Sequence, residues 1–486
     1  MANSVMANDL FDGANASLDG IKVSSIEYDS RRVENGSCFV AMRGFSVDGH
    51  EYIEKAVSNG ASMVVQERDI DSTGSVPVVK VSDSREELAR LADRFYGSPS
   101  SKLGVIGITG TNGKTTVSYI LQKILEDGGY NVSRIGTVEY SFPDGTENAP
   151  NTTPESADLQ KLFARSTRFE NPRCIIEASS HGLALGRLSH TIFRTAIFMN
   201  PTQDHLDFHK SMDEYESSKS ILFTGFEPEY SIINIDDNAG RRLAGSGING
   251  EVITFGFSED ADMHISDSKT DWEGSTFTLA TPNGTLEIAT PMPGKHNIYN
   301  TTAAVVAGIA EGLDPVGVIR SAKSVATVPG RFEKIETGRG FSVVVDYAHT
   351  DNALANILGT AREITGGKVI CLFGCGGDRD KAKRKLMGQA ADTLADIVVV
   401  TSDNPRTEEP SKIIDDILEG VKEKNGEKIH VIESRRDAIK KAIELAEPGD
   451  SVVIAGKGHE TYQIVGSERF DFDDRVIASD VIRGLR

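Results

Sequence analysis

The stretch "GVIGITGTNGKTT", residues 104–116, decides the fold of this chain. An apolar run of strand character passes into a glycine-rich turn, and the segment that follows, "KTTVSYILQKILEDGG", is typical of a helix. Glycines let backbone N–H groups approach a phosphate closely, and a helix N-terminus favours an anion. Lys114 adds a positive charge, and the Thr115 hydroxyl suits Mg²⁺. The pattern predicts a phosphate loop that comprises Gly110, Thr111, Asn112, Gly113, Lys114, Thr115 and Thr116.

This loop departs from the common pattern at one position. The first glycine is expected at 108, where the chain has Ile108, and Gly107 stands one place early. The alternative interpretation is a glycine-rich turn between a strand and a helix with no ligand. The Lys-Thr pair at the start of the helix favours the phosphate loop.

Strand-like runs alternate with helical patterns on both sides of the loop. Examples are "CIIEAS", "RTAIFMN", "YSIINID", "FSVVVDYAH", "KVICLFGCGG", "DIVVVTSD" and "DSVVIAG". Such alternation predicts an α/β protein built from parallel sheets. A chain of 486 residues exceeds one core, and we expect three α/β domains. Their expected bounds are 1–101, ending in the linker "YGSPSSK", 102–330, with a β-rich addition at 251–290, and 331–486, which is Rossmann-like.

Composition excludes several classes of protein. The net charge of −20 argues against general nucleic-acid binding, which needs a basic surface. We see no apolar stretch long enough to cross a bilayer and no secretory signal in the first 20 residues. The four cysteines, Cys38, Cys174, Cys371 and Cys375, are sparse, so we expect reduced structural thiols rather than disulfides or a zinc site. These observations predict a cytoplasmic location.

Charged side chains follow several of the apolar runs. Glu177 and Ser179 end the run in "IIEASSHGL", and His205 lies in the dense polar stretch "NPTQDHLDFH" at 200–209. A carboxylate at a strand end near a phosphate loop suits Mg²⁺. A zinc site is the alternative at 200–209, but no cysteine lies nearby and oxygen-rich surroundings favour Mg²⁺.

Further polar residues occur in helical and strand-end contexts. Asn297 and Asn300 are three apart at an expected helix start, where capping is the alternative to ligand binding. Arg331 in "PGRFE" and the pair Asp346 and His349 in "VVVDYAHT" could hold the phosphates and ribose of a nucleotide. Lys219, in the helical segment "DEYESSKSILF", would by its pattern alone be a solvated lysine.

The turn "TSDNPRTEEP", residues 401–410, also follows an apolar, β-branched run. Asn404-Pro405 favours a turn, and Asp403 and Arg406 flank it. Ligands of open α/β sheets bind at the carboxyl ends of strands, so this turn either reads a charged ligand or is a surface loop. We expect the acidic tail, Glu408 and Glu409, to be solvated surface.

Taken together, these motifs carry a resemblance. In this order and spacing, "GTNGKTT", "EASSH", "DHLDFH", "HNIYN", "PGRFE" and "DYAHT" resemble the Mur ligase family of ATP-dependent amide-forming ligases, from about residue 25 to the C-terminus. "DSRRV", "NTTPES", "YESSKS", "GCGGDRDKAKR", "DNPR" and "GKGHE" resemble the members that add 2,6-diaminopimelate to a UDP-N-acetylmuramoyl dipeptide.

The resemblance implies ATP as co-substrate and Mg²⁺ as cofactor. It implies that ATP phosphorylates a substrate carboxylate and that an amine displaces the phosphate. The phosphate loop, Asn300, Arg331, Asp346 and His349 would lie around ATP, and Thr115, Glu177 and His205 around Mg²⁺. Lys219 matches a lysine that is carbamylated in the family, so that it would act as an anion toward a metal. Lys114, His205, Lys219 and Arg331 would be the catalytic residues.

The resemblance also implies the other two substrates. UDP-N-acetylmuramoyl-L-alanyl-D-glutamate would contact Ser30 in an N-terminal uridine-nucleotide domain, together with Asn151, Thr152, Thr153, Ser179 and Arg187. The family often has a glutamine two places before that arginine, whereas this chain has Leu185. meso-Diaminopimelate would contact Arg379, Asp403, Asn404, Pro405, Arg406, Gly456 and Glu460 in the C-terminal domain.

We therefore expect an enzyme of small-molecule substrates, a monomer, that acts in peptidoglycan precursor synthesis without nucleic acid or membrane as partner. Arg406 could hold the far carboxylate of diaminopimelate, while Asp403 or Glu460 holds the far ammonium. The alternatives are a related ligase that adds L-lysine and a folylpolyglutamate-type ligase. A nucleotide-dependent switch would need no amino-acid site.

Overall fold

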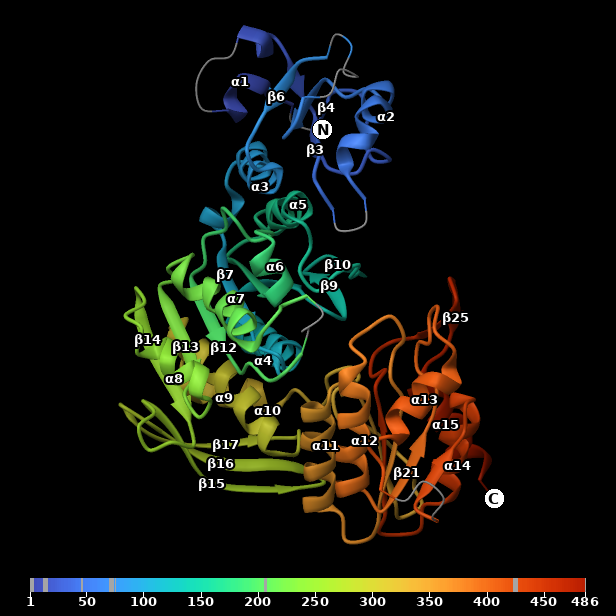
Figure 1. The fold of residues 1–486 in the computed structure, drawn as a ribbon. Helices are drawn as coiled ribbons and strands as arrows, with labels where there is room; N and C mark the ends of the chain where they lie inside the picture. Colours follow the sequence, from blue (N-terminus) through green and yellow to red (C-terminus); the bar gives the residue numbers. More distant parts are fainter. Residues whose placement is uncertain are drawn as a thin grey trace.

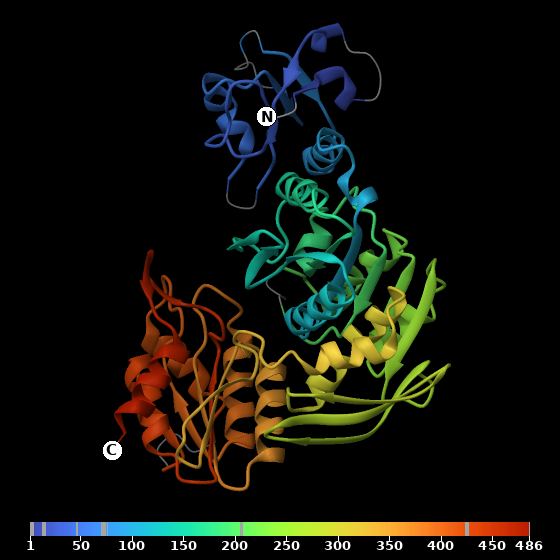
Figure 2. The same ribbon diagram turned by 180° about the vertical axis from the view of Figure 1, so that it is seen from behind.

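The computed structural model describes residues 4–11, 16–44, 47–69, 74, 76–204, 208–422 and 427–485. Its ribbon forms three bodies along the chain, with the first at one end of the central body and the third against the opposite side (Figures 1 and 2). Each body is built on a sheet with parallel strands, as the alternation of strand-like and helical runs predicts. The α/β fold class is confirmed.

The N-terminal body has a four-stranded parallel sheet in the order β3 (Ser25–Glu27), β4 (Ser37–Val40), β5 (Met63–Gln66) and β6 (Val78–Lys80). Its helices are α1 (Ala7–Leu10), α2 (Ile53–Ser58) and α3 (Ser84–Phe95), and the ribbon β1 (Val5–Met6) with β2 (Lys22–Val23) lies beside them. This body is tied to α5 (Ser156–Ser166) of the central body, because Tyr28 and Arg32 both donate to Asp158, at 2.5 and 2.7 Å.

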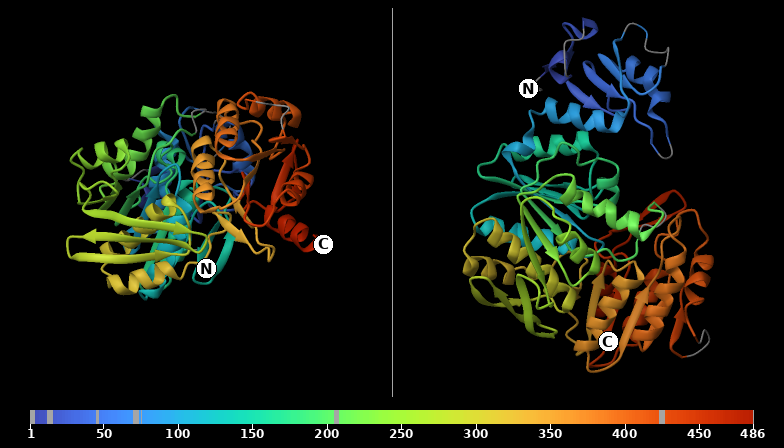
Figure 3. Two further views of the ribbon diagram at one scale, coloured as in Figure 1. Left: turned by 90° about the horizontal axis from the view of Figure 1, so that it is seen from below. Right: turned by 60° about the vertical axis from the view of Figure 1, so that its left-hand side comes forward.

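The central body contains an eleven-stranded sheet. Seven strands pair in parallel in the order β8 (Asn131–Ile135), β11 (Pro172–Glu177), β7 (Gly104–Thr109), β12 (Thr195–Phe198), β13 (Tyr230–Asn234), β14 (Glu251–Gly256) and β15 (Met263–Asp271). Antiparallel strands complete both edges: β9 (Glu139–Phe142) with β10 (Gly145–Asn148), and β16 (Gly274–Thr281) with β17 (Gly284–Thr290). The β-rich addition expected at 251–290 therefore extends the same sheet (Figure 3).

Strand β7 occupies the point at which the strand order changes direction. The chain passes from β7 to β8 on one side, places β11 between them, and then crosses to β12 on the other side. Loops diverge at such a point and leave a crevice at the carboxyl ends of the strands. The helices of this body are α4 (Lys114–Asp127), α5, α6 (Ser180–Ala184), α7 (Met212–Thr224), α8 (Asn238–Ala244), α9 (Lys295–Ala310) and α10 (Pro315–Lys323).

The C-terminal body is a doubly wound sheet of six strands. Its order is β18 (Glu333–Ile335), β19 (Ser342–Asp346), β23 (Ser451–Ala455), β20 (Val369–Phe373), β21 (Ile397–Val400) and β22 (Ile429–Val431), and only the edge strand β18 is antiparallel in the described range. Helices α11 (Asp351–Ile364), α12 (Ala382–Leu394) and α13 (Pro410–Leu418) pack on one face. Helices α14 (Arg435–Glu444) and α15 (Asp474–Gly484) pack on the other, and a hairpin, β24 (Tyr462–Val465) and β25 (Glu468–Asp471), projects from the sheet.

The C-terminal body meets the central body near the long strands of its sheet. Trp272, the single tryptophan of the chain, packs beside Phe332 with 6.1 Å between ring centroids, and its carbonyl accepts a hydrogen bond from Lys334 at 2.9 Å. Helix α11 lies against β15 on the same side (Figure 3). The carboxyl ends of β7 and β19 thereby face one space between the two bodies.

Candidate active site

The phosphate loop lies between β7 and α4, as the sequence predicts. Gly113 adopts a φ of 93°, and a side chain there would meet the Asn300 Oδ1 atom at 2.4 Å, so the position needs glycine. The Lys114 ammonium donates hydrogen bonds to the carbonyls of Gly110 and Thr111, at 2.7 and 3.1 Å. Burial lowers the pKa of Lys114, and an anionic ligand would offset this effect.

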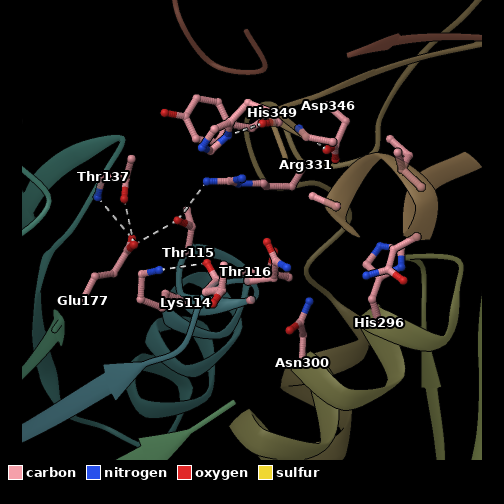
Figure 4. Close-up of a pocket in the computed structure, with 18 of the residues that line it drawn as sticks. Lys114, Thr115, Thr116, Thr137, Glu177, His296, Asn300, Arg331, Asp346 and His349 are labelled. Atoms are coloured by element: carbon pink, nitrogen blue, oxygen red, sulfur yellow. Dashed lines mark hydrogen bonds between the residues drawn. The ribbon is translucent and has the colours of Figure 1, made fainter. Parts of the chain in front are cut away.

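A hydrogen-bonded chain of polar side chains stands over the start of α4 (Figure 4). The Thr115 hydroxyl donates to Glu177 Oε2 at 3.0 Å, and Arg331 donates to the Thr115 oxygen at 3.2 Å. Glu177 is fully buried and also accepts hydrogen bonds from the Thr137 backbone N–H, at 3.2 Å, and hydroxyl, at 2.8 Å. Thr137 was not predicted from the sequence, although it follows β8 and therefore shares the sheet edge of Glu177.

Asp346 holds the segment that joins the two bodies. Its two carboxylate oxygens accept hydrogen bonds from the backbone N–H groups of Phe332 and Ala348, both at 2.7 Å. Burial raises the pKa of this carboxyl. Arg331, next to Phe332, stacks over the Tyr347 ring at 4.5 Å from its centroid, so the guanidinium points across the space toward Thr115 (Figure 4).

His349 is held in one tautomer. Its Nδ1 lies 2.9 Å from the Tyr347 carbonyl oxygen, which can only accept, so Nδ1 carries the proton and Nε2 bears the lone pair. Burial lowers the pKa of His349, and the nearby Lys383 acts in the same direction. The ring is therefore neutral at physiological pH.

Helix α9 contributes the asparagine pair predicted at its start. Asn300 Nδ2 donates to Asn297 Oδ1 at 3.1 Å, and Asn297 Nδ2 donates to the Pro293 carbonyl at 2.9 Å. Both side chains are buried, and both line a cavity of about 240 Å³ with the phosphate loop, Arg331 and His349. His296, also on this wall, has its pKa lowered by burial to about 4 and is neutral.

A second cavity, of about 410 Å³, lies at the carboxyl ends of the C-terminal strands. The structure brings together on its wall six of the residues expected to bind an amino acid: Arg379, Asp403, Asn404, Arg406, Gly456 and Glu460. Pro405 is buried between two of them. Burial raises the pKa of Glu460, and the neighbouring Asp403 carboxylate adds to this effect.

The two cavities adjoin. Both are lined by Thr137, Thr152, Asp204, Tyr347 and His349. A group bound at the phosphate loop and a group bound at the turn 403–406 would therefore meet beside His349.

The sequence-based expectation for Glu408 was wrong. Its carboxylate accepts two hydrogen bonds from the buried Arg384, at 2.8 and 3.0 Å, and one from the Asp378 backbone N–H at 2.7 Å. Arg384 lies 24 residues away in the sequence, on α12, so only the tertiary fold reveals the pair. Glu409 is exposed, as expected, and pairs with Lys412 at 2.9 Å.

The residues expected to contact a UDP-linked substrate separate into two places. Thr153, Ser179 and Arg187 form one cluster: the Thr153 and Ser179 hydroxyls are 2.9 Å apart, and Arg187 donates to the Thr153 carbonyl at 3.0 Å. Thr152 and Asn151 adjoin this cluster in the chain and line the second cavity. Ser30 lies in the N-terminal body and lines neither cavity.

Leu185, at the position where the family often has a glutamine, lies in the same region. Leu185 is the C-cap residue of helix α6 and has no polar side-chain atom, whereas Arg187, two residues on, is paired with Glu155 at 3.3 Å. Arg85 of the N-terminal body donates to the same Glu155 carboxylate at 3.3 Å. Glu155 therefore links the two bodies beside the Thr153 cluster.

Lys219 lies on α7 and is 1% exposed, unlike the solvated lysine that its sequence pattern alone indicates. Burial lowers its pKa well below the ordinary value, with Lys114 acting in the same direction. Its ammonium nitrogen is 4.3 Å from the centroid of the Tyr215 ring. His205 and Asp207 fall outside the described residues. Within the described part of the chain, no three His, Cys, Asp or Glu side chains gather as a ready-made metal site.

Comparisons with known proteins agree with this arrangement. Three family models match successive segments: the Mur ligase family catalytic domain at residues 22–96, the Mur ligase middle domain at 108–308, and the Mur ligase glutamate ligase domain at 330–458. The chain belongs to the Mur ligase family. It is therefore an ATP-dependent ligase that forms amide bonds.

Individual relatives define the similarity further. The chain is 43% identical over 470 residues to the UDP-N-acetylmuramoyl-L-alanyl-D-glutamate–2,6-diaminopimelate ligase of Clostridium botulinum, covering 96% of both chains. It is 42% identical to the protein of the same name from Bacillus cereus, covering 95% of this chain and 94% of that one. A solved structure of a UDP-N-acetylmuramoyl-L-alanyl-D-glutamate–2,6-diaminopimelate ligase matches with a TM-score of 0.72 and 32% identity over 99% of each chain.

A more distant likeness concerns the fold alone. The structure of MurF ligase from Thermotoga maritima in complex with ADP matches with a TM-score of 0.64 and 19% identity, covering 95% of this chain and 96% of that one.

Among the described residues, no helix is both long and apolar enough to span a membrane.

Proposed function

We propose that this enzyme joins meso-2,6-diaminopimelate to UDP-N-acetylmuramoyl-L-alanyl-D-glutamate and converts ATP to ADP and phosphate. One observation carries the proposal: a cavity at the phosphate loop adjoins a cavity lined by Asp403, Asn404, Arg406 and Glu460. Relatives at 42–43% identity over nearly the whole chain bear the name of this ligase and support the choice of substrates.

The reaction has two steps. An oxygen of the D-glutamate side-chain carboxylate attacks the γ-phosphorus of ATP, the bond to the ADP oxygen breaks, and an acyl phosphate forms. The amine of diaminopimelate then attacks the acyl carbon, loses a proton, and phosphate leaves with its bonding electron pair. The first step brings two anions together, and Lys114 and Arg331 offset their repulsion from either side of the cavity.

The residues around Glu177 fit Mg²⁺. The Thr115 hydroxyl and the buried Glu177 carboxylate present oxygen atoms 3.0 Å apart, and Mg²⁺ binds through one or two carboxylates together with phosphate oxygens. We assign Thr115, Glu177 and His205 to this ion on the strength of the family pattern. When bound, Mg²⁺ would neutralise charge on the phosphates of ATP.

We also assign the substrates to the three domains, 1–101, 102–330 and 331–486. The nucleotide lies against the phosphate loop, Asn300 and Arg331, with Asp346 holding the Arg331 segment and His349 beside the γ-phosphate. The UDP-linked dipeptide extends from Ser30 past Asn151, Thr152, Thr153, Ser179 and Arg187. Tyr28, Arg32 and Arg85 support this path because they tie the first domain to the second.

The second cavity suits an amino acid with charges at both ends. Arg406 can donate two parallel hydrogen bonds to the far carboxylate, with Arg379 at the exposed rim, and Asp403 and Glu460 can accept from the far ammonium. L-Lysine has no far carboxylate and would leave the half-buried Arg406 without an anion, which lowers the free energy of binding. The cationic rim therefore favours diaminopimelate over lysine.

The burial and lowered pKa of Lys219 suit carbamylation, because a neutral amine is the form that reacts with carbon dioxide. The carbamate would supply an anion beside Lys114. The four cysteines are buried and unpaired, which fits a reducing compartment, and we place a monomeric enzyme in the cytoplasm.

Purified protein with ATP, Mg²⁺, the UDP-linked dipeptide and meso-diaminopimelate tests the proposal. Phosphate release should require both the dipeptide and the amino acid, and mass spectrometry should show the tripeptide product. Phosphate release that is independent of diaminopimelate would contradict it.

A further inference from the structure

Lys457 is a buried lysine beneath the second cavity that the proposed chemistry leaves without a role. It follows β23, is 0% exposed, and is the only lysine side chain of the described residues within hydrogen-bonding distance of Glu460. Its ammonium donates to Asn404 Oδ1 at 3.0 Å and to Glu460 Oε2 at 3.3 Å, and lies 3.6 Å from Asp403 Oδ1. A charge in this position acts on the three residues that line the acidic part of the cavity.

The hydrogen bonds around Lys457 fix the orientation of Asn404. The Asn404 Oδ1 atom accepts from Lys457 and from the Ile464 backbone N–H, at 3.0 Å each, while its Nδ2 donates to Glu460 Oε2 at 2.9 Å. A flipped amide would place an NH₂ group against the ammonium. In the described structure, both protein donors to Glu460 meet Oε2, so Oε1 is the oxygen left to face a ligand.

The charges of this part of the cavity sum to zero. Asp403 and Glu460 contribute two negative charges, and Lys457 and Arg406 contribute two positive ones. The far end of diaminopimelate, one ammonium and one carboxylate, also sums to zero, whereas the far end of lysine carries a net charge of +1. Without Lys457 the same groups would sum to −1, which complements a lone ammonium. Asp380 and Lys383 also line the cavity, and their opposite charges cancel, while the charge of the exposed Arg379 is screened by solvent. The buried Arg435, which also acts on Asp403 and Glu460, is neutralised by Asp474 at 2.6 Å.

We propose that Lys457 is a positioning residue that sets the amino-acid selectivity, by orienting Asn404 and Glu460 and by balancing one of the two cavity carboxylates. The inference rests on the proposed function. It assigns the preference for a zwitterionic far end to a lysine that does not touch the substrate, in addition to the arginine that does.

The test compares kcat/KM for meso-diaminopimelate with kcat/KM for L-lysine. Lys457→Met removes the charge and keeps much of the volume, and should lower this ratio on the order of tenfold or more, because a buried charge a few ångströms from the ligand is weakly screened. Lys457→Met with Glu460→Gln restores a zero sum and should recover most of the ratio. Lys440→Met, an exposed lysine on α14, is the control for loss of a positive charge and should leave the ratio unchanged.

An unchanged ratio in Lys457→Met, or a double variant that falls as far as the single one, would overturn the inference. A purely structural lysine would lower both kcat/KM values together and would show no recovery in the double variant. If Lys457→Met does not fold, Glu460→Gln is compared with the double variant. These two proteins also differ only at position 457, and neither has an unpaired buried carboxylate at 460. The unaltered enzyme distinguishes this inference from the proposed function, because no diaminopimelate-dependent turnover there would refute the proposed function itself.

Discussion

Glu408→Gln tests most fully how the turn 403–408, which lines the second cavity, is held in place by its ion pairs and hydrogen bonds. Glu408 joins the turn 403–408 to the loop before α12, because its carboxylate accepts from the Arg384 guanidinium and from the Asp378 N–H. Arg384 is 0% exposed, and its remaining carboxylate partner is Asp416, at 2.8 Å. The variant therefore weakens the pair of Arg384 with residue 408 and leaves the pair of Arg384 with Asp416 in place.

The magnitude follows from these contacts. Hydrogen bonds to charged groups contribute about 1.5–3 kcal/mol each, and glutamine still offers one acceptor oxygen. Since Asp416 keeps Arg384 paired and the Glu408 side chain is 17% exposed, we expect the free energy of unfolding to fall by about 2 kcal/mol. For a domain of about 150 residues this lowers Tm by roughly 4–8 °C. Because the turn carries Asp403 and Arg406, KM for diaminopimelate should rise while KM for ATP stays near its original value.

The effect should depend on pH. Hydrogen bonds from Arg384 lower the pKa of Glu408 from 4.5 to about 2. A carboxyl with a lowered pKa stabilises the fold above its ordinary value of 4.5 and loses that contribution as the pH falls toward 2. The difference in stability between the unaltered protein and Glu408→Gln should therefore be complete at neutral pH and shrink below pH 4.5.

Calorimetry gives Tm, and amide hydrogen exchange at residues 374–384 locates the change. Glu409→Gln is the matched control, because the adjacent Glu409 is 59% exposed and pairs with an exposed lysine. It should leave both Tm and KM unchanged. Equal shifts in the two variants, or an unchanged KM for diaminopimelate in Glu408→Gln, would refute the reasoning.

Three further predictions concern the cavities. Arg406→Ala should raise KM for diaminopimelate by roughly a hundredfold or more and KM for ATP little, in steady-state assays, since the far carboxylate of the substrate loses its guanidinium partner; equal effects on both would contradict its assignment. Lys219→Ala should reduce turnover strongly while calorimetric ATP affinity changes little, and unchanged turnover would count against a carbamylated role. Gly456→Ala should weaken diaminopimelate binding, measured by calorimetry, because the new Cβ would meet Asp403 Oδ2 at 2.7 Å at a φ of 114°; normal binding would show that the backbone can yield there.

Local patterns predicted much of this architecture, for physical reasons. A parallel strand buried on both faces reads as an apolar run, and its carboxyl end is where polar side chains gather. Glu177, Asp346 and Asp403 were found in this way, and the structure places them at facing sheet edges. The phosphate loop adds a short-range signal, because its glycines are required by the backbone path.

The features that the sequence did not reveal depend on contacts between distant segments. The Glu408 pair needs α12 to pack beside the turn, and Lys457 contacts the hairpin after β23 through Tyr462, whose ring centroid lies 5.7 Å from the Lys457 ammonium nitrogen. Thr137 follows β8 and lies at the same edge of the sheet as Glu177, but a single threonine has no sequence pattern that distinguishes it from a surface residue. Side-chain type and spacing identify the edge, whereas burial and pairing identify the residues that work there.

The dependence of phosphate release on the amino acid tests the central claim most directly. With ATP, Mg²⁺ and UDP-N-acetylmuramoyl-L-alanyl-D-glutamate present, meso-diaminopimelate should start rapid release of phosphate together with the tripeptide product, and L-lysine at the same concentration should give far less. Equal rates with lysine, or release that needs no amino acid, would contradict the account.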